Sequence, residues 1–171
     1  MNPLLDFSGL PRFASIRPAH VTAAVDTLLR DNRALIERLT QTDTPATWRA
    51  FVEPLEDAHE RLSRAWGVVG HLHSVLDSPE LREVYNANQP KIVEYYTELG
   101  QNLTLFDKYK ALKSSPEYAN LDAAQRTIID NEIRDFRLSG AELSDEKKKR
   151  FGEISAALAQ LSTKFSENVL D

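Results

Sequence analysis

Apolar residues recur at helical spacing through nearly the whole chain, and this periodicity decides the fold class. The clearest case lies between Leu55 and Leu76, where a leucine or valine returns every seventh residue and Ala58, Ala65 and Leu72 fill intermediate positions. A seam of this kind packs between neighbouring helices. No convincing alternation with a period of two, the sign of a strand, is present. The sequence therefore predicts an all-α chain, an antiparallel bundle of about five to six helices.

End signals place the first three helical stretches. The first runs from about residue 19 to 40, after a proline-marked extended start, and QTDTPAT breaks it. The second is the heptad stretch, with Pro54 marking either its start or a kink. Ser78, an N-cap residue followed directly by proline, begins the third. Its apolar side continues to Tyr109, and a kink is predicted at Pro90.

Two further helices complete the chain. After the KSSPEY break, one helix is predicted from about residue 122 to 138, ending near Gly140. The last begins at Ser144 and carries an apolar stripe formed by Phe151, Ile154, Leu158, Leu161 and Phe165. Because this helix is still in register at Asp171, we expect the chain to be a truncated piece of a longer polypeptide. Self-association through the uncovered stripe is a further expectation.

Composition narrows the function classes. The 171 residues are 42% hydrophobic, enough for a single helical domain over residues 1–171 that buries roughly 70% of its unfolded surface. The net charge of −5 argues against nucleic-acid binding. Apolar runs fall far short of the roughly 20 residues that cross a bilayer, and the start is not a signal peptide. The absence of cysteine excludes disulfides and fits a cytoplasmic location.

The pair His59-Glu60 is the nearest approach to a catalytic motif. Zinc peptidases use H-E-x-x-H, in which two histidines on one helix face bind the metal and the glutamate acts as general base. Here the fifth position is Ser63, which cannot replace an imidazole. Glu56-x-x-His59 likewise supplies one of the two pairs that a di-iron bundle needs. The residues therefore predict no catalytic, cofactor-binding or metal site in this chain.

The remaining chemical candidates favour structural roles. His71 and His73 lie about 200° apart on a helix and cannot share a metal, and we expect His59 and His73 at the edge of the packed stripe. The basic run EKKKR at 146–150 has acidic neighbours and is typical of a solvated face. The sequon at Asn102 falls in a predicted helix and is attributed to chance. The helically spaced aromatic residues are predicted to be core: Trp48, Trp66, Tyr85, Tyr95, Tyr96 and Tyr109.

Several stretches are distinctive when taken together: NPLLDF, LPRFASIRPAHVTAAV, TWRAFVEPLEDAHERLSRAWGVVGHLHSV, DSPELREVYN, IRDFRLSGAEL and FGEISAALAQLSTKFSENVLD. The most specific are DFRLSG at 135–140 and FSENVL at 165–170. In order, and over essentially the whole chain, they resemble the N-terminal region of the thimet-oligopeptidase family of zinc metallopeptidases. One departure is Ala19, which stands before His20 where the family usually has an acid, and it weakens a local helix-start contact at most.

The resemblance implies a specific role. Members of this family are elongated, almost wholly helical enzymes with two lobes. A deep, narrow channel between the lobes admits short peptides and excludes folded proteins. Zinc is held in the C-terminal lobe by an HExxH motif and a downstream glutamate, and none of these residues has a counterpart here. The resemblance thus implies a non-catalytic N-terminal lobe of a neurolysin-like fold, inactive alone, whose partner is the C-terminal catalytic lobe.

Two other readings of the residues remain open. One is a free-standing helical interaction module whose exposed apolar stripe docks a partner. An HExxH motif downstream in the gene favours the peptidase lobe, whereas a stop codon after Asp171 favours the module. The other is a metal-dependent helical-bundle enzyme, which elemental analysis of the purified protein would detect.

Overall fold

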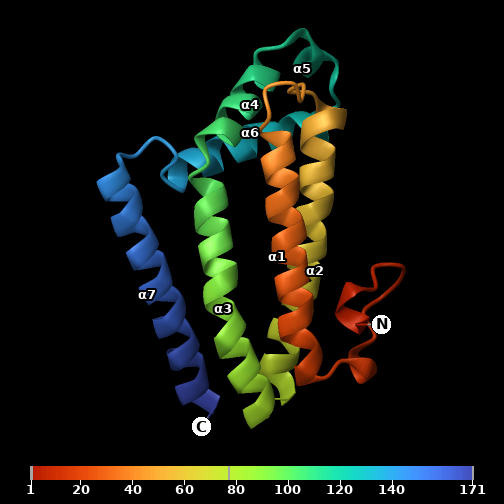
Figure 1. The fold of residues 1–171 in the computed structure, drawn as a ribbon, viewed down its shortest axis with the longest axis vertical. Coiled ribbons are helices and arrows are strands. Elements are labelled where there is room, and N and C mark those ends of the chain that lie inside the picture. Colours follow the sequence, from red (N-terminus) through yellow and green to blue (C-terminus); the bar gives the residue numbers. More distant parts are fainter. Residues whose placement is uncertain (1, 77, 171) are drawn as a thin grey trace. The chain divides into compact units, whose positions relative to one another are not determined.

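The computed structural model describes residues 2–76 and 78–170, and within these residues the chain forms helices and connecting segments but no strand. The all-α prediction is confirmed. Two short 3₁₀ helices and a π-helical turn accompany seven α-helices in this described part (Figure 1). In chain order the elements are Pro3–Leu5 and Phe13–Ser15 (3₁₀), α1 (Pro18–Leu39), Trp48–Val52 (π), α2 (Glu53–Leu76), α3 (Pro79–Gly100), α4 (Leu103–Lys113), α5 (Pro116–Asn120), α6 (Ala123–Leu138) and α7 (Asp145–Leu170).

The chain divides into two compact units. The first comprises Met1–Ile36 and Leu55–Ile92, and the second comprises Glu37–Pro54 and Val93–Asp171. The boundary falls within α1, α2 and α3, so each of these helices contributes to both units. A single domain over residues 1–171 stays a prediction.

In the first unit, α1, α2 and the beginning of α3 run alongside one another (Figure 1). The amide of Asn88 donates to the Thr22 hydroxyl at 2.8 Å, and Lys91 pairs with Asp26 at 2.7 Å. Because both numbers rise together, α1 and α3 are parallel, and α2, which connects them in the chain, runs in the opposite direction (Figure 1). The apolar positions that define the helical period form the core: Leu4, Ile16, Val21, Ala24, Val25, Leu28, Leu29, Leu55, Leu62, Ala65, Val68, Val69, Leu72, Leu81 and Ile92.

Two predictions in this unit need correction. Leu76, placed at the end of the heptad seam, is 66% exposed because α2 ends at this residue. His73, placed at the edge of the seam, is buried against the ring of Tyr85. Ser78 does cap α3 as predicted, since its hydroxyl accepts a hydrogen bond from the Leu81 N–H at 3.2 Å.

The N-terminal segment is fastened to the helices of the first unit. The side chain of Asn2 donates to the carbonyl of His20 at 2.7 Å. Phe13 packs edge-on against His71 with ring centroids 5.6 Å apart, and the Arg64 guanidinium donates to the carbonyl of Gly9. These contacts use a backbone carbonyl of α1 and side chains of α2, so the segment follows the surface of the unit.

In the second unit, α4 and α6 pack antiparallel around an aromatic core. Phe136 lies 5.6 Å from Phe106 and 5.7 Å from Tyr109, measured between ring centroids. Phe51, on the π-helical turn, meets the Tyr109 ring edge-on at 4.8 Å. The other buried apolar side chains of this unit are Leu39, Val52, Tyr95, Leu105, Leu112, Ile129, Ile133 and Ala141.

The third helical stretch was wrong in its length. It ends at Gly100, and α4 begins at Leu103 after an Asn102 N-cap whose side chain accepts from the Leu105 N–H at 3.0 Å. The break permits a close approach, because a Cβ placed on Gly100 would lie 2.6 Å from the Cβ of Ser139. Any larger residue at this position would collide with the C-cap of α6.

The last two helices begin where they were predicted to begin, and α6 also ends there. Asp122 closes a reciprocal capping box with Gln125 at the start of α6. Gly140 follows the helix with φ of +86°, the left-handed conformation that favours glycine after a C-terminus. α7 then starts directly after Ser144. The final residue of the predicted last helix, Asp171, lies outside the described residues.

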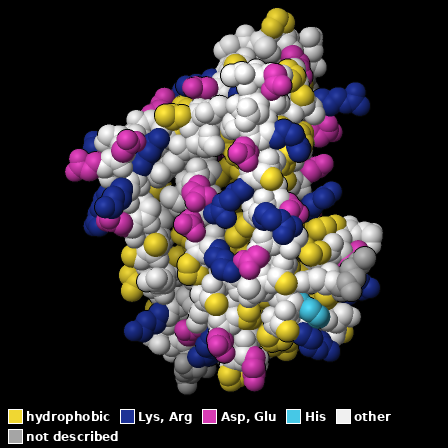
Figure 2. Space-filling model, in the orientation of Figure 1, with side chains coloured by type: hydrophobic (Ala, Val, Ile, Leu, Met, Phe, Trp, Pro, Cys, Tyr) yellow, Lys and Arg dark blue, Asp and Glu magenta, His cyan; other side chains and the backbone are white. Residues whose placement is uncertain are grey.

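The apolar stripe of α7 lies largely on the surface. Phe151 is partly buried, but the four stripe residues that follow it are exposed. Near its beginning the helix contacts the turn that follows α3, since the side chain of Gln101 donates to the Lys148 carbonyl at 3.5 Å. Gly152 there faces the methyl group of Thr97. In Figure 2, hydrophobic side chains are visible at the surface over the lower half of α7.

Candidate functional site

The His59-Glu60 pair does not converge on one point. His59 is partly buried on α2, and desolvation lowers the pKa of its imidazole to about 4, which keeps the ring neutral at pH 7. Glu60 and Ser63 are both exposed. The side chains that would have to share a zinc ion therefore lie in different environments, and they do not fit that metal.

Glu56 lies one helical turn before His59 and is the most unusual carboxyl group of α2. Burial raises its pKa, and its Oε1 atom is buried without a hydrogen-bond partner. A carboxyl group of this kind beside a neutral imidazole is what acid–base chemistry requires. Over residues 2–76 and 78–170, however, no three His, Asp or Glu side chains gather as a metal site would require.

A stack of three rings lies in the first unit. Tyr85 of α3 lies parallel to Trp66 at 4.8 Å and to His73 at 4.2 Å, measured between centroids. The Nε2 atom of His73 is buried with no hydrogen-bond partner. The stack holds α2 against α3 through ring faces. Its role in the described structure is packing.

The other aromatic predictions have mixed outcomes. Tyr95 and Tyr109 are almost fully buried, as predicted for core residues. Tyr96 is 40% exposed and is not part of the core. Trp48 is partly buried, and its backbone N–H donates to a Glu117 carboxylate oxygen at 3.0 Å. The helical period alone could not tell which of these aromatic residues are buried. Neighbouring positions on a helix differ by 100°, and the face that packs into a core is itself about 100° wide.

The polar motifs of the sequence take structural places. Asn102 of the sequon caps α4 with its side chain. Within the basic run, Lys148 donates to the carbonyl of Gln101 at 3.4 Å, and Arg150 pairs with Glu153 at 3.0 Å. Figure 2 shows basic and acidic side chains interspersed over the visible face. That distribution is unlike the single-sign stripe of a nucleic-acid-binding surface.

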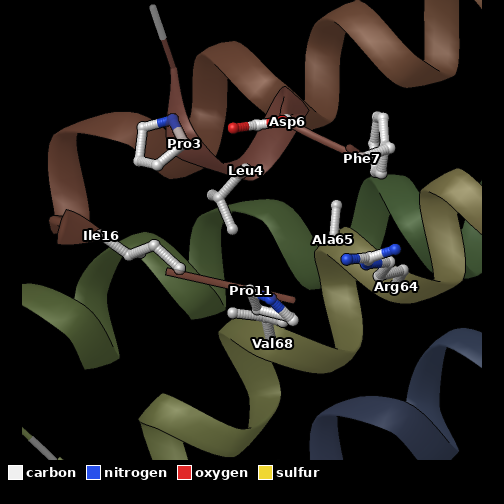
Figure 3. A pocket seen from close by; sticks show the side chains of 9 residues that line it. All are labelled: Pro3, Leu4, Asp6, Phe7, Pro11, Ile16, Arg64, Ala65 and Val68. Carbon is white, nitrogen blue, oxygen red and sulfur yellow. The ribbon is translucent and has the colours of Figure 1, made fainter. Parts of the chain in front are cut away.

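A small cavity lies beneath the N-terminal segment (Figure 3). Its lining consists of Pro3, Leu4, Asp6, Phe7, Pro11 and Ile16 from that segment and Arg64, Ala65 and Val68 from α2. The cavity is partly open to solvent, and its volume, measured to the centre of a water molecule, is about 10 Å³, which holds about one water molecule. A peptide or a cofactor cannot enter it.

Comparison with known proteins assigns the chain to a family. Residues 25–148 match the N-terminal domain of neurolysin/thimet oligopeptidase. The chain therefore belongs to the neurolysin/thimet oligopeptidase family, in agreement with the resemblance read from its motifs. No helix in the described part of the chain is both long and apolar enough to span a bilayer.

Within the family, its relatives include bacterial and plant oligopeptidases. The chain is 47% identical over 170 residues to "Oligopeptidase A" of Haemophilus influenzae and 43% identical to that of Escherichia coli. It is 39% identical to the "Probable cytosolic oligopeptidase A" of Arabidopsis thaliana. These alignments cover 99% of this chain and 24–25% of each relative. The chain thus spans about a quarter of the length of the relatives it matches.

Proposed function

We propose that this chain is the N-terminal, non-catalytic helical lobe of a zinc metallo-oligopeptidase that hydrolyses short peptides, and that it forms one wall of the substrate channel. The observation that carries the proposal is the alignment of 170 residues, at 47% identity, with a quarter of an oligopeptidase A. Zinc is the cofactor of the full-length enzyme in this proposal. The catalytic lobe is the direct partner of the chain.

The side chains of α2 support a non-catalytic role. The one His-Glu pair of the sequence has an inward, neutral His59 and an outward Glu60, and Ser63 occupies the place of a second ligand. A wall has a different task from a catalytic centre. It limits the length of substrate that enters and helps exclude water when the lobes close. Rigid helical packing, like that of Phe136 between α4 and α6, suits this task.

A cytoplasmic location belongs to the same proposal. Its support is the name of one plant relative, "Probable cytosolic oligopeptidase A", together with a sequence that contains no cysteine. Fractionation of cells that express the tagged protein tests it, and recovery of the tag in a membrane or periplasmic fraction would contradict it.

The first functional test uses the chain alone. A fluorogenic short peptide is incubated with the purified protein and added zinc, with and without a chelator. We expect no turnover above the rate of buffer with zinc. Turnover that the chelator abolishes would show that the 171 residues contain a metallopeptidase site, and the proposal would then be wrong.

The second test asks whether the chain can serve as the lobe. In this test the chain replaces the matching N-terminal quarter of the Haemophilus influenzae relative. The resulting hybrid is assayed on a short peptide and on a folded protein. We expect hydrolysis of the peptide and none of the folded substrate. The controls are the relative with its own N-terminal quarter and the relative with that quarter deleted. A folded hybrid no more active than the deletion variant would refute the channel-wall assignment.

The free-standing interaction module remains the second candidate, and the exposed face of α7 favours it. Five large apolar side chains lie there on the surface: Ile154, Leu158, Leu161, Phe165 and Val169. Such a face is typical of a helix that binds another polypeptide. The gene itself separates the two candidates. A reading frame that continues to an HExxH motif supports the peptidase lobe, and a stop codon after residue 171 supports the module.

A further inference from the structure

The N-terminal segment, residues 2–16, lies along one face of α2 in the manner of a bound peptide. Three contacts between the segment and the helix rise together in number: Phe7 with Arg61, Gly9 with Arg64, and Phe13 with His71. Six residues of extended chain reach at most roughly 20 Å, and ten residues of helix rise about 15 Å. The stretch from residue 7 to residue 13 therefore runs parallel to α2.

The N-terminal segment is also closed by hydrogen bonds of its own. The Asp6 carboxylate accepts from the N–H and the hydroxyl of Ser8, at 3.1 and 2.6 Å, and pairs with Arg12 at 2.5 Å. The N–H of Ser15 donates to the carbonyl of Arg12 at 2.8 Å. Loops that are packed by their own side chains in this way form compact units on a protein surface. These bonds involve no atom of α2, so separation from that helix does not break them.

Two aliphatic side chains anchor the N-terminal segment. Leu4 and Ile16 are 4% and 7% exposed, and both line the small cavity together with Ala65 and Val68 of α2 (Figure 3). That cavity is partly open to solvent, so the segment does not seal completely against the helix. The middle of the segment stays outside the core, since Leu10 is 91% exposed.

The strength of the two anchors sets how often the N-terminal segment leaves α2. Burial of one aliphatic side chain favours the closed form by about 10- to 100-fold, so two anchors favour it by roughly 10²- to 10⁴-fold. The exposed hydrogen bond between Arg64 and Gly9 adds little. A typical folded domain, in contrast, outnumbers its globally unfolded form by about 10⁴-fold at the least. The segment therefore separates from α2 more often than the helices unfold.

We propose that the N-terminal segment is a detachable cover of α2, which leaves and returns as one piece while α1 and α2 stay folded. Its departure uncovers an apolar strip, Ala65 and Val68, beside the side chains of Arg61, Arg64 and His71. The segment is thus the resident ligand of this helix face, and any other polypeptide must displace it to reach the strip. This inference is independent of the proposed peptidase role.

The first experiment measures how often the helix face is uncovered. The chain has no cysteine, so the thiol introduced by Val68→Cys beneath the segment has no competitor for a thiol reagent. The matched control is Val69→Cys, because Val69 is the next residue, is 1% exposed and does not line the cavity.

The two thiols should differ in rate and in their response to urea. Without denaturant, Val68→Cys should react roughly 10²- to 10⁴-fold more slowly than the same variant unfolded in urea. Val69→Cys should react at least about 10-fold more slowly still, because it is reached only when the helices unfold. Low concentrations of urea should accelerate the labelling of Val69→Cys alone, since detachment of the segment exposes little surface.

The second experiment changes the two equilibria separately. Leu4→Ala removes an anchor and should accelerate the labelling of Val68→Cys roughly 30-fold, and Leu4→Val, which keeps most of the anchor, should accelerate it less. Val25→Ala weakens the helix core, where Val25 is 2% exposed. It should accelerate the labelling of Val69→Cys about 10-fold and leave that of Val68→Cys unchanged, because the core is intact whether the segment is docked or detached.

Three outcomes overturn the proposal. Labelling of Val68→Cys at the rate of the unfolded chain would show that the segment does not cover α2. Equal rates and equal urea dependence for Val68→Cys and Val69→Cys would show that the face is uncovered only when the helices unfold. The same conclusion follows if Val25→Ala accelerates both thiols equally. These measurements use no peptidase assay, so a negative result leaves the proposed function untouched.

Discussion

The close approach at Gly100 gives the sharpest prediction about stability. A Cβ at this position would lie 2.6 Å from the Cβ and 2.8 Å from the hydroxyl oxygen of Ser139. Ordinary contact begins at about 3.4 Å, so Gly100→Ala requires the two chain segments to separate by about 0.8 Å. Because the obstacle is a short side chain beside the backbone of the α6 C-cap, it cannot simply rotate away.

The magnitude follows from two opposing effects. Overpacking of this kind costs about 1–3 kcal/mol, and alanine recovers at most about 1 kcal/mol of the helix preference that glycine lacks. We therefore expect Gly100→Ala to lower the free energy of unfolding by about 1–2 kcal/mol, or the melting temperature by roughly 2–8 °C. Urea denaturation followed by circular dichroism at the helical band measures it.

Two further variants make the test specific. Gly152→Ala is the matched control, because its Cβ would meet its nearest atom, the Thr97 methyl group, at an ordinary 3.8 Å. It should leave stability unchanged or raise it by up to about 1 kcal/mol. Ser139→Gly removes the obstacle and should recover most of the loss when combined with Gly100→Ala. If the double variant is no more stable than Gly100→Ala alone, the steric reasoning is wrong.

Three other changes test the core, a helix start and a buried imidazole. Phe136→Ala removes the ring that packs on Phe106 and Tyr109 and should cost about 3–5 kcal/mol in a urea titration; a loss below about 1 kcal/mol would contradict its place in the core. Asp122→Ala breaks the capping box of α6 and should lower the free energy of unfolding by about 1 kcal/mol. Asp122→Asn, measured in parallel, should retain most of the stability that the cap provides. Burial lowers the pKa of His59 from 6.5 to about 4. The unfolded chain therefore binds a proton on this imidazole more tightly than the folded chain does. The stability contributed by the neutral His59 is complete above pH 6.5 and is lost as the pH falls toward 4. Denaturation of His59→Gln and the parent at pH 7, 6 and 5 should show a slope in this window that is shallower in the variant by up to about 1.4 kcal/mol per pH unit, and identical slopes would exclude a neutral buried imidazole.

The helix limits could be predicted wherever one local signal decided them. Gly140 requires a left-handed conformation and ends α6 within two residues of the predicted place. Ser78 begins α3 through its own hydroxyl. The break between α3 and α4 was missed because the apolar spacing continues across it to Tyr109, although Gly100 and the N-cap Asn102 mark it locally. The close approach of Gly100 to Ser139, 39 residues away, is a tertiary feature that no short window of the sequence contains.

Burial was harder to predict than helicity. The period of α7 correctly identified one apolar face, but the same period describes the buried face of α2 and the exposed face of α7 equally well. What differs is whether another element lies against it. The candidate site shows the same limit: the sequence places Glu56 one turn before His59, but the orphaned carboxylate oxygen and the neutral imidazole are consequences of the surrounding fold.

The two tryptophans lie in different compact units, so tryptophan fluorescence can follow the unfolding of each unit separately. Trp66 belongs to the first compact unit, stacked on Tyr85, and Trp48 belongs to the second, where its backbone is hydrogen-bonded to Glu117. Replacing either indole by phenylalanine leaves a single fluorophore in one unit. The emission of each variant then follows the melting of that unit alone. If the melting curves of the two variants coincide, the two units unfold as one cooperative body. If the curves differ, the two units unfold one after the other.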